Sequence, residues 1–152
     1  MANSVCEVLV TEARLDSAVA AKTAATTEGS DLGTGAIVDF WGAVRALEEG
    51  REIEGIDYEA HRRMAEHQLR LVTEAAAEKF QLKKVIAHHR IGFVRAGEPS
   101  LFLRVSAQRR SAAFEASKWI VDELKRKVPI WKRPKFKIDN RRAAETAATT
   151  AK

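Results

Sequence analysis

The sequence predicts a single α+β domain. Short alternating runs of apolar and polar residues predict strands, and apolar residues at 3.6-residue spacing predict two long helices. Strands and helices do not follow the strict alternation of a doubly wound parallel sheet, so we expect an α+β fold. The 152 residues, 45% of them hydrophobic, suffice for one domain with a sizeable core. We expect this domain over residues 1–138 and a disordered tail at 139–152.

The N-terminal part contains two candidate strands. Residues 5–10 (VCEVLV) suit the first strand, and residues 15–22 suit a short helix. Residues 23–34 are rich in Ala, Thr and Gly, and we expect a mobile connection there. The second strand covers residues 36–41, and its alternation gathers one set of side chains on a shared face: Ala36, Val38 and Phe40.

The central part predicts a long helix between strands. Residues 42–50 suggest a charged loop and residues 53–59 a return strand. The helix runs from about residue 61 to residue 80 and buries a side that comprises Met64, Leu71, Val72 and Ala75. Residues 85–89 and 101–107 predict two further strands joined through a Gly-Glu-Pro turn. In the second of these, one face carries Leu101, Leu103 and Val105 and the other carries Phe102 and Arg104.

The last helix has the clearest pattern. Ser111 is placed to cap its start, and Pro129 prevents it from continuing past residue 128. Its predicted buried stripe comprises Phe114, Ser117, Ile120, Val121 and Leu124. The apolar pattern ends after residue 137.

Composition narrows the class of protein. No run of 18 apolar residues predicts a membrane span. The first twelve residues lack a basic start, and Glu7 interrupts their apolar stretch, so we expect no signal peptide. The single cysteine, Cys6, excludes an internal disulfide and a multi-cysteine zinc site. We therefore expect a cytoplasmic protein.

The net charge of +5 and the pI of about 9.6 predict attraction to anions. Nucleic acid, a phosphorylated metabolite, an acidic protein partner and simple solubility would each account for this charge. The 21 acidic residues argue against a basic nucleic-acid-binding arm. The position of the basic residues is therefore more informative than their number.

Arg109 and Arg110 directly precede the predicted helix at Ser111. A helix start presents unpaired N–H groups and a partial positive charge, so two arginines beside it suit a phosphate or carboxylate. A solvated basic turn is an equally good interpretation.

Three side chains near the end of this helix are further candidates. Lys125 lies at the edge of the apolar stripe and Lys132 follows Pro129, where partial burial and neighbouring cations would make an amine a usable nucleophile or proton donor. Lysines at a helix C-terminus more commonly only interact with its dipole. Trp119, on the polar side, would either anchor a partner or pack under a neighbouring loop.

The sequence predicts no metal site and no nucleotide-phosphate loop. His88 and His89 are adjacent in a strand and point to opposite faces, while His61 and His67 are six residues apart on a helix. The glycines before residue 36 lack the Lys-Ser/Thr ending of a phosphate-binding loop.

Four segments resemble, in the same order, the large subunit of molybdopterin synthase. They are GAIVDFWGAVR (35–45), IDYEAH (56–61), HHRIG (88–92) and SAAFEASKWIVDELKRKVPIWKR (111–133). The resemblance covers roughly residues 35–133, and VPIWKR is its most specific part. It implies an α/β hammerhead-like domain that forms a homodimer, with a small ubiquitin-like carrier at each end of a heterotetramer.

The resemblance also implies a reaction. The carrier's Gly-Gly thiocarboxylate would enter a pocket of the large subunit and provide sulfur to cyclic pyranopterin monophosphate, forming the dithiolene of molybdopterin. This sulfurtransferase reaction, part of molybdenum cofactor biosynthesis, would need no metal or organic cofactor. A chain with one cysteine agrees with a separate sulfur donor.

Residue by residue, the resemblance gives Lys125 and Lys132 catalytic roles and gives Arg45, Arg109 and Arg110 substrate-binding roles. Arg109 departs from the histidine usual in the family, which keeps a cation but removes a group that titrates near neutral pH. Arg133-Pro134 replaces a usual Lys/Arg-Glu pair, and the tail has no match.

Two alternatives stay open from the sequence. A small basic nucleic-acid-binding domain would explain the charge, although no aromatic-rich RNA-recognition strand is present. A non-catalytic homologue that docks the carrier would explain the change at Arg109, but both lysines argue against it.

Overall fold

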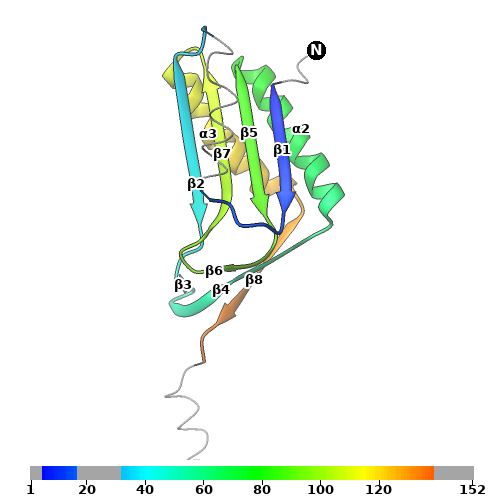
Figure 1. Cartoon of the computed structure of the whole chain (residues 1–152), viewed down its shortest axis with the longest axis vertical. Helices are drawn as coiled ribbons and strands as arrows, with labels where there is room; N and C mark the ends of the chain where they lie inside the picture. Colours follow the sequence, from blue (N-terminus) through cyan, green and yellow to red (C-terminus); the bar gives the residue numbers. More distant parts are fainter. Residues whose placement is uncertain (1–4, 17–31, 139–152) are drawn as a thin grey trace, which may run out of the picture.

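Two sheets organise the computed structural model, which describes residues 5–16 and 32–138 (Figure 1). The larger sheet has the strand order β1-β5-β7-β2. Its bounds are Cys6–Thr11 for β1, Lys84–Arg90 for β5, Pro99–Ala107 for β7 and Ala36–Ala43 for β2. β1 and β5 pair in parallel, whereas β5, β7 and β2 pair antiparallel. The predicted α+β class is confirmed.

Both helices, α2 (Arg62–Phe80) and α3 (Arg110–Lys127), cover one face of the larger sheet (Figure 1). Successive strand residues point to opposite faces, so Val38 of β2 and Leu103 and Val105 of β7 enter the core under the helices. The face assignments predicted for these two strands are therefore correct.

The predicted buried side of α2 is wrong at all but one position. Met64, Leu71 and Ala75 are exposed, and Val72 is buried. The buried side comprises Ala65, Leu69, Val72, Thr73, Ala76 and Ala77. Alanine contributes little to an apolar pattern, yet its small side chain lets a helix lie close to a sheet, which is why the pattern pointed to the larger residues.

The start of α3 also differs from the prediction. Its N-cap residue is Arg109, which makes no side-chain capping hydrogen bond, and Ser111 lies inside the first turn. Phe114 is 63% exposed, whereas Ser117, Ile120 and Leu124 are buried and Val121 is half-buried. The helix ends at Lys127, before Pro129, as predicted.

A second sheet lies at one end of the first (Figure 1). Its strands are β3 (Leu47–Glu48), β4 (Arg51–Ala60), β6 (Gly92–Arg95) and β8 (Ile130–Phe136). The expected loop at 42–50 is wrong because it contains β3, which forms a hairpin with β4 through Glu49 and Gly50. Both of these residues have positive φ, as a two-residue hairpin requires.

β4 is the central strand of this second sheet, since β6 and β8 both pair with its segment from Gly55 to Tyr58. A Cβ atom at Gly55 would lie 2.3 Å from the carbonyl oxygen of Val94 in β6, so the close approach of β6 requires glycine. The sequence predicted neither β6 nor β8.

The face of the larger sheet opposite the helices carries its own small cluster. Leu15 covers Ile86 and Phe102 there, and the Trp41 and Phe102 rings lie 4.5 Å apart. Arg104 donates to Asp39 at 2.6 Å across the β2–β7 pair. The N-terminal segment therefore protects part of this face.

Some expectations fall outside the described residues. The helix expected at 15–22 lies mostly there, as do the mobile connection at 23–34 and the tail at 139–152. Within 5–16 and 32–138, no helix combines the length and apolar character needed to cross a membrane.

Candidate active site

A pocket of about 380 Å³ opens beneath the C-terminal half of α3. Residues of β2, β4, β5, β7, α3 and β8 line it, so the two sheets and the helix meet here. Its volume lies within the usual range for small-molecule sites. Most of the lining is apolar, provided by Phe40, Leu101, Val121, Leu124, Val128 and Ile130.

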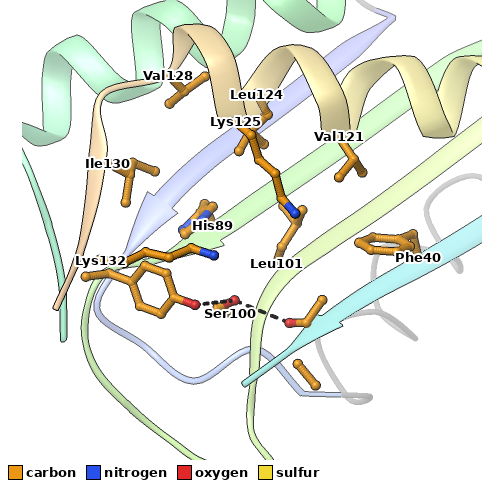
Figure 2. A pocket seen from close by; sticks show the side chains of 13 residues that line it. Phe40, His89, Ser100, Leu101, Val121, Leu124, Lys125, Val128, Ile130 and Lys132 are labelled. Atoms are coloured by element: carbon orange, nitrogen blue, oxygen red, sulfur yellow. Dashed lines mark hydrogen bonds between the residues drawn. The ribbon is translucent and has the colours of Figure 1, made fainter. Parts of the chain in front are cut away.

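Lys125 and Lys132 bring their amines into this pocket from different elements. Figure 2 shows Lys125 reaching down from α3 and Lys132 reaching across from β8, with both amine ends directed into the same space. Both residues remain exposed in the single chain, so the expected partial burial of Lys125 is not found. The structure nonetheless brings the two predicted lysines together, and we call this cavity the lysine pocket.

The pocket lysines differ from their neighbours in ion pairing. Lys118 and Lys127 of α3 pair with Asp122 and Glu123, and Lys135 of β8 pairs with Glu54. Among the described residues, no carboxylate pairs with Lys125 or Lys132. Two unpaired ammonium groups in an apolar-walled pocket favour an anionic ligand.

The change of direction that follows the end of α3 explains how Lys132 reaches the pocket. Pro129 ends the helix, and β8 then runs antiparallel to β4 with Lys132 opposite Tyr58. Because strand side chains alternate, Ile130 and Lys132 both line the pocket.

Two hydroxyl groups form the polar floor of the pocket. The Tyr58 hydroxyl donates to Oγ of Ser100 at 3.2 Å, and that hydroxyl donates to the carbonyl oxygen of Gly42 at 3.3 Å (Figure 2). Burial raises the pKa of Tyr58, so the phenol stays protonated at neutral pH. Each hydroxyl proton is therefore committed within the protein.

His89 completes the polar lining. Its Nδ1 lies 2.8 Å from the carbonyl oxygen of Arg90, and its ring contacts Tyr58 edge-on at 5.4 Å. Burial lowers the pKa of His89 to about 4, and the charge of Lys132 adds to this shift. The imidazole is therefore neutral under physiological conditions.

The pocket lining contains no aspartate or glutamate. Within the described part of the chain, no group of three or more histidine, cysteine or acidic side chains is arranged to hold a metal. His88, as predicted, points to the opposite face from His89, where its ring contacts Phe102 and lies 3.7 Å from Glu7.

A separate pocket lies at the start of α3, and we call it the arginine pocket. Its lining consists of Arg109 and Arg110 with Gly35, Gln108 and Ser111. A Cβ atom at Gly35 would lie 2.3 Å from the carbonyl oxygen of Gln108, so only glycine allows the two segments to meet this closely. Helix N–H groups and two guanidinium groups make this second pocket suitable for an anion.

A single chain does not bring Arg45, Arg110 and Lys125 into one pocket. Arg110 belongs to the arginine pocket and Lys125 to the lysine pocket, and Arg45 lines neither. Arg45 is exposed in the turn after β2, two residues beyond the end of that strand. The basic residues of the sequence therefore form at least two separate groups.

Trp119 packs against its neighbour and is not a free anchor. Its ring meets that of Phe80 in α2 edge-on, with centroids 6.0 Å apart, and the residue is half-buried. Trp119 therefore packs within the chain, as one interpretation predicted, although against helix α2 and not under a loop.

Sequence reasoning missed His89, Tyr58 and Ser100 as pocket residues. The alternation of β5 and β7 could place His89 and Leu101 on one face, but not identify what lies above them. Tyr58 belongs to β4 in the second sheet, so it reaches the site only because the two sheets meet there, a long-range arrangement without a local signal.

Comparison with known proteins places this geometry in a family. The family model described as MoaE protein matches residues 10–127. A molybdopterin synthase catalytic subunit from Pyrococcus abyssi is 42% identical over 104 residues, which cover 68% of this chain and 70% of that protein. The related rice proteins are longer, and the chain spans 53% of their length.

Solved structures agree with this assignment. The molybdopterin synthase structure from Staphylococcus aureus superimposes with a TM-score of 0.74 at 26% identity, covering 88% of this chain and 92% of that one. A complex of subunits 1 and 2 of the molybdopterin-converting factor from Helicobacter pylori shares the fold, with a TM-score of 0.62, 22% identity, and coverage of 89% and 91%. From these matches, this chain belongs to the MoaE family, whose relatives include the molybdopterin synthase catalytic subunits.

Proposed function

We propose that this chain transfers sulfur from the thiocarboxylated C-terminus of a small carrier protein to cyclic pyranopterin monophosphate, forming the dithiolene of molybdopterin. The convergence of the unpaired amines of Lys125 and Lys132 in an apolar-walled pocket carries this proposal. A thiocarboxylate is an anion on a slender chain end, and the two ammonium groups would hold it through charge-assisted hydrogen bonds.

The chain's own cysteine supports an external sulfur donor. Cys6 is 7% exposed in the core, and burial raises the pKa of its thiol. A buried, protonated thiol is a poor nucleophile, so Cys6 does not suit sulfur delivery. Its survival as a free thiol fits the reducing cytoplasm, which we propose as the location.

The arginine pocket suits the substrate phosphate, and we assign Arg109 and Arg110 to it. Arg45 lines neither pocket in one chain, and we assign it to substrate binding as a cation that joins the site on assembly. One chain does not join the arginine pocket to the lysine pocket. We propose a homodimer in which the arginines of one copy approach the lysines of the other, with one carrier bound at each end. The Helicobacter pylori complex of two converting-factor subunits supports a carrier partner.

A reconstituted assay tests the proposed function. The chain is mixed with a thiocarboxylated Gly-Gly-ended carrier and cyclic pyranopterin monophosphate, and dithiolene formation is measured. Product that depends on all three components is expected. Carrier binding without product would instead indicate the non-catalytic homologue.

A further inference from the structure

His89 is a buried polar residue of the lysine pocket to which the proposed chemistry has so far given no role. It is 6% exposed and lines the pocket together with Lys125 and Lys132. Its Nδ1 lies 2.8 Å from the carbonyl oxygen of Arg90. A carbonyl oxygen only accepts hydrogen bonds, so Nδ1 carries the proton and Nε2 of the neutral ring carries a lone pair.

The free lone pair of Nε2 is open to the pocket. None of the described residues forms a hydrogen bond to Nε2. Among these residues, the side-chain nitrogen that lacks a hydrogen-bond partner and is also fully buried is Nε of Arg90, and Nε2 of His89 is not in that position. Nε2 is therefore accessible from the pocket that His89 lines.

The other polar groups around the pocket limit which side chains could donate a hydrogen bond to Nε2. The protons of Tyr58 and Ser100 are committed to Ser100 and to Gly42. The remaining side-chain donors of the lining are the ammonium groups of Lys125 from α3 and Lys132 from β8. The lining contains no carboxylate that would compete for these ammonium groups. The charge of Lys132 acts on the imidazole, and Figure 2 shows the Lys132 side chain beside His89.

We propose that a rotamer change of the exposed Lys132 side chain brings its ammonium to the free Nε2 of His89, so that His89 is a positioning residue that accepts this hydrogen bond and directs the amine toward the bound anion. This inference rests on the proposed function only in taking Lys132 as the amine that serves the reaction. His89 itself does not transfer a proton in this arrangement, because an imidazole that stays neutral to about pH 4 is a weak base toward an ammonium group.

Two substitutions by residues with amide side chains distinguish the roles of the two ring nitrogens. His89→Asn keeps an N–H near Nδ1 for the Arg90 carbonyl and removes the acceptor facing the pocket, whereas His89→Gln places an amide oxygen near the level of Nε2. We expect His89→Asn to lower kcat about tenfold, which corresponds to about 1.4 kcal/mol. His89→Gln should retain most of the wild-type kcat, and KM for the carrier should change little in both variants.

A second measurement needs no substrate. Brief acylation with acetic anhydride, followed by mass spectrometry, reports the reactivity of each lysine amine. A hydrogen bond to the ammonium form favours that unreactive form, so His89→Asn should increase labelling of Lys132 severalfold while His89→Gln does not. Lys135 on the same strand, paired with Glu54, is the internal control.

Imidazole ¹⁵N shifts at neutral pH provide the third readout, and we expect protonated Nδ1 and unprotonated Nε2. The opposite tautomer would overturn the proposal, as would equal kcat and equal Lys132 labelling in the Asn and Gln variants. If wild-type protein forms no dithiolene product, the proposed function fails. Labelling and the tautomer still decide the contact between His89 and Lys132.

Discussion

The lysine pocket and the arginine pocket are both basic, yet they are built in opposite ways. The lysine pocket collects residues from six separate elements and surrounds two amines with apolar walls. The arginine pocket consists of Gly35 and the continuous stretch 108–111 at a helix start. A site built from distant elements fixes the directions of its side chains, whereas a helix start provides anion affinity largely through the backbone. We therefore expect the first to perform chemistry and the second to hold a substrate group.

Removing the Lys125 amine should give the largest effect. Lys125→Ala is expected to lower product formation by at least about 100-fold, as the loss of a group that stabilises charge in a reaction typically does. Lys118→Ala is the matched control, because Lys118 lies on the same helix, is 82% exposed and pairs with Asp122. Near-normal turnover by Lys125→Ala, with an unchanged melting temperature, would remove the functional distinction between the two pockets.

The pH dependence of the free energy of unfolding should test whether His89 is buried as a neutral ring in the lysine pocket. Above pH 6.5 the ring is neutral in both states, but between pH 6.5 and about 4 only the unfolded chain takes up the proton. Stability should therefore fall over this window as pH decreases, by up to about 3 kcal/mol from this group. In urea unfolding, His89→Gln should lose this part of the pH dependence, whereas the exposed His67→Gln should behave as wild type. Equal pH profiles for all three proteins would show that His89 is not buried as a neutral ring.

Loss of Arg110 should weaken binding more than it slows the reaction. Arg110→Ala is expected to raise Kd for the pterin by about one to two powers of ten, because a hydrogen bond to a charged group contributes roughly 1.5–3 kcal/mol. Calorimetric titration with cyclic pyranopterin monophosphate measures this change, and Arg126→Ala, on the same helix outside both pockets, is the control. A changed kcat with unchanged Kd would place Arg110 in the chemical step.

Mixed dimers should show whether the two pockets cooperate across copies. Chains with Lys125→Ala and chains with Arg110→Ala are each impaired, but half of all dimers would be heterodimers after exchange, and each heterodimer would contain one intact site if the site is shared. Roughly a quarter of wild-type activity is then expected after equal mixing and exchange. Activity no greater than the sum of the unmixed variants would place both groups in one chain or abolish the shared site.

The smallest effect is expected from Arg109→His. The substitution installs the histidine that the resemblance implies at this position and keeps a donor at the helix start, so Kd for the pterin at pH 6 should stay within about threefold of wild type. Affinity should then weaken between pH 6 and 8 as the new imidazole loses its charge. A flat profile would show that position 109 does not contact the anion.

The sequence predicted the elements with strong local signals. β2, α2 and α3 were found because strand alternation, the helical spacing of apolar residues or Pro129 marks them. Lys125 and Lys132 were candidates from their positions around the end of the last helix, and the resemblance gave them catalytic roles. β8 was missed because its Lys, Arg and Pro residues show no apolar alternation. The pairing partners that make it a strand lie in β4, 70 or more residues earlier along the chain. Long-range pairing of this kind leaves no local signature.

The same reason explains which parts of the pocket were not predicted. His89 and Tyr58 are ordinary strand residues until β5 and β4 come together under α3, and no spacing along the chain connects them. The exposed Phe114 and the buried alanines of α2 show the converse, because hydrophobicity alone does not decide which side of a helix meets the sheet. Packing against distant elements decides both cases.

The break at Pro129 makes chain length, as well as residue type, a determinant of this site. Helix α3 fixes the position of Lys125, and the pairing of Lys132 with Tyr58 fixes the other end, so the segment between the two lysines spans two anchored points. One residue inserted after Pro129 would move Trp131 to the position of Lys132 and turn the lysine to the opposite side of β8. The hairpin at Glu49 and Gly50 has no such constraint, since it lies outside the lysine pocket. Insertions and deletions should therefore be tolerated at that hairpin and rejected between residues 128 and 132.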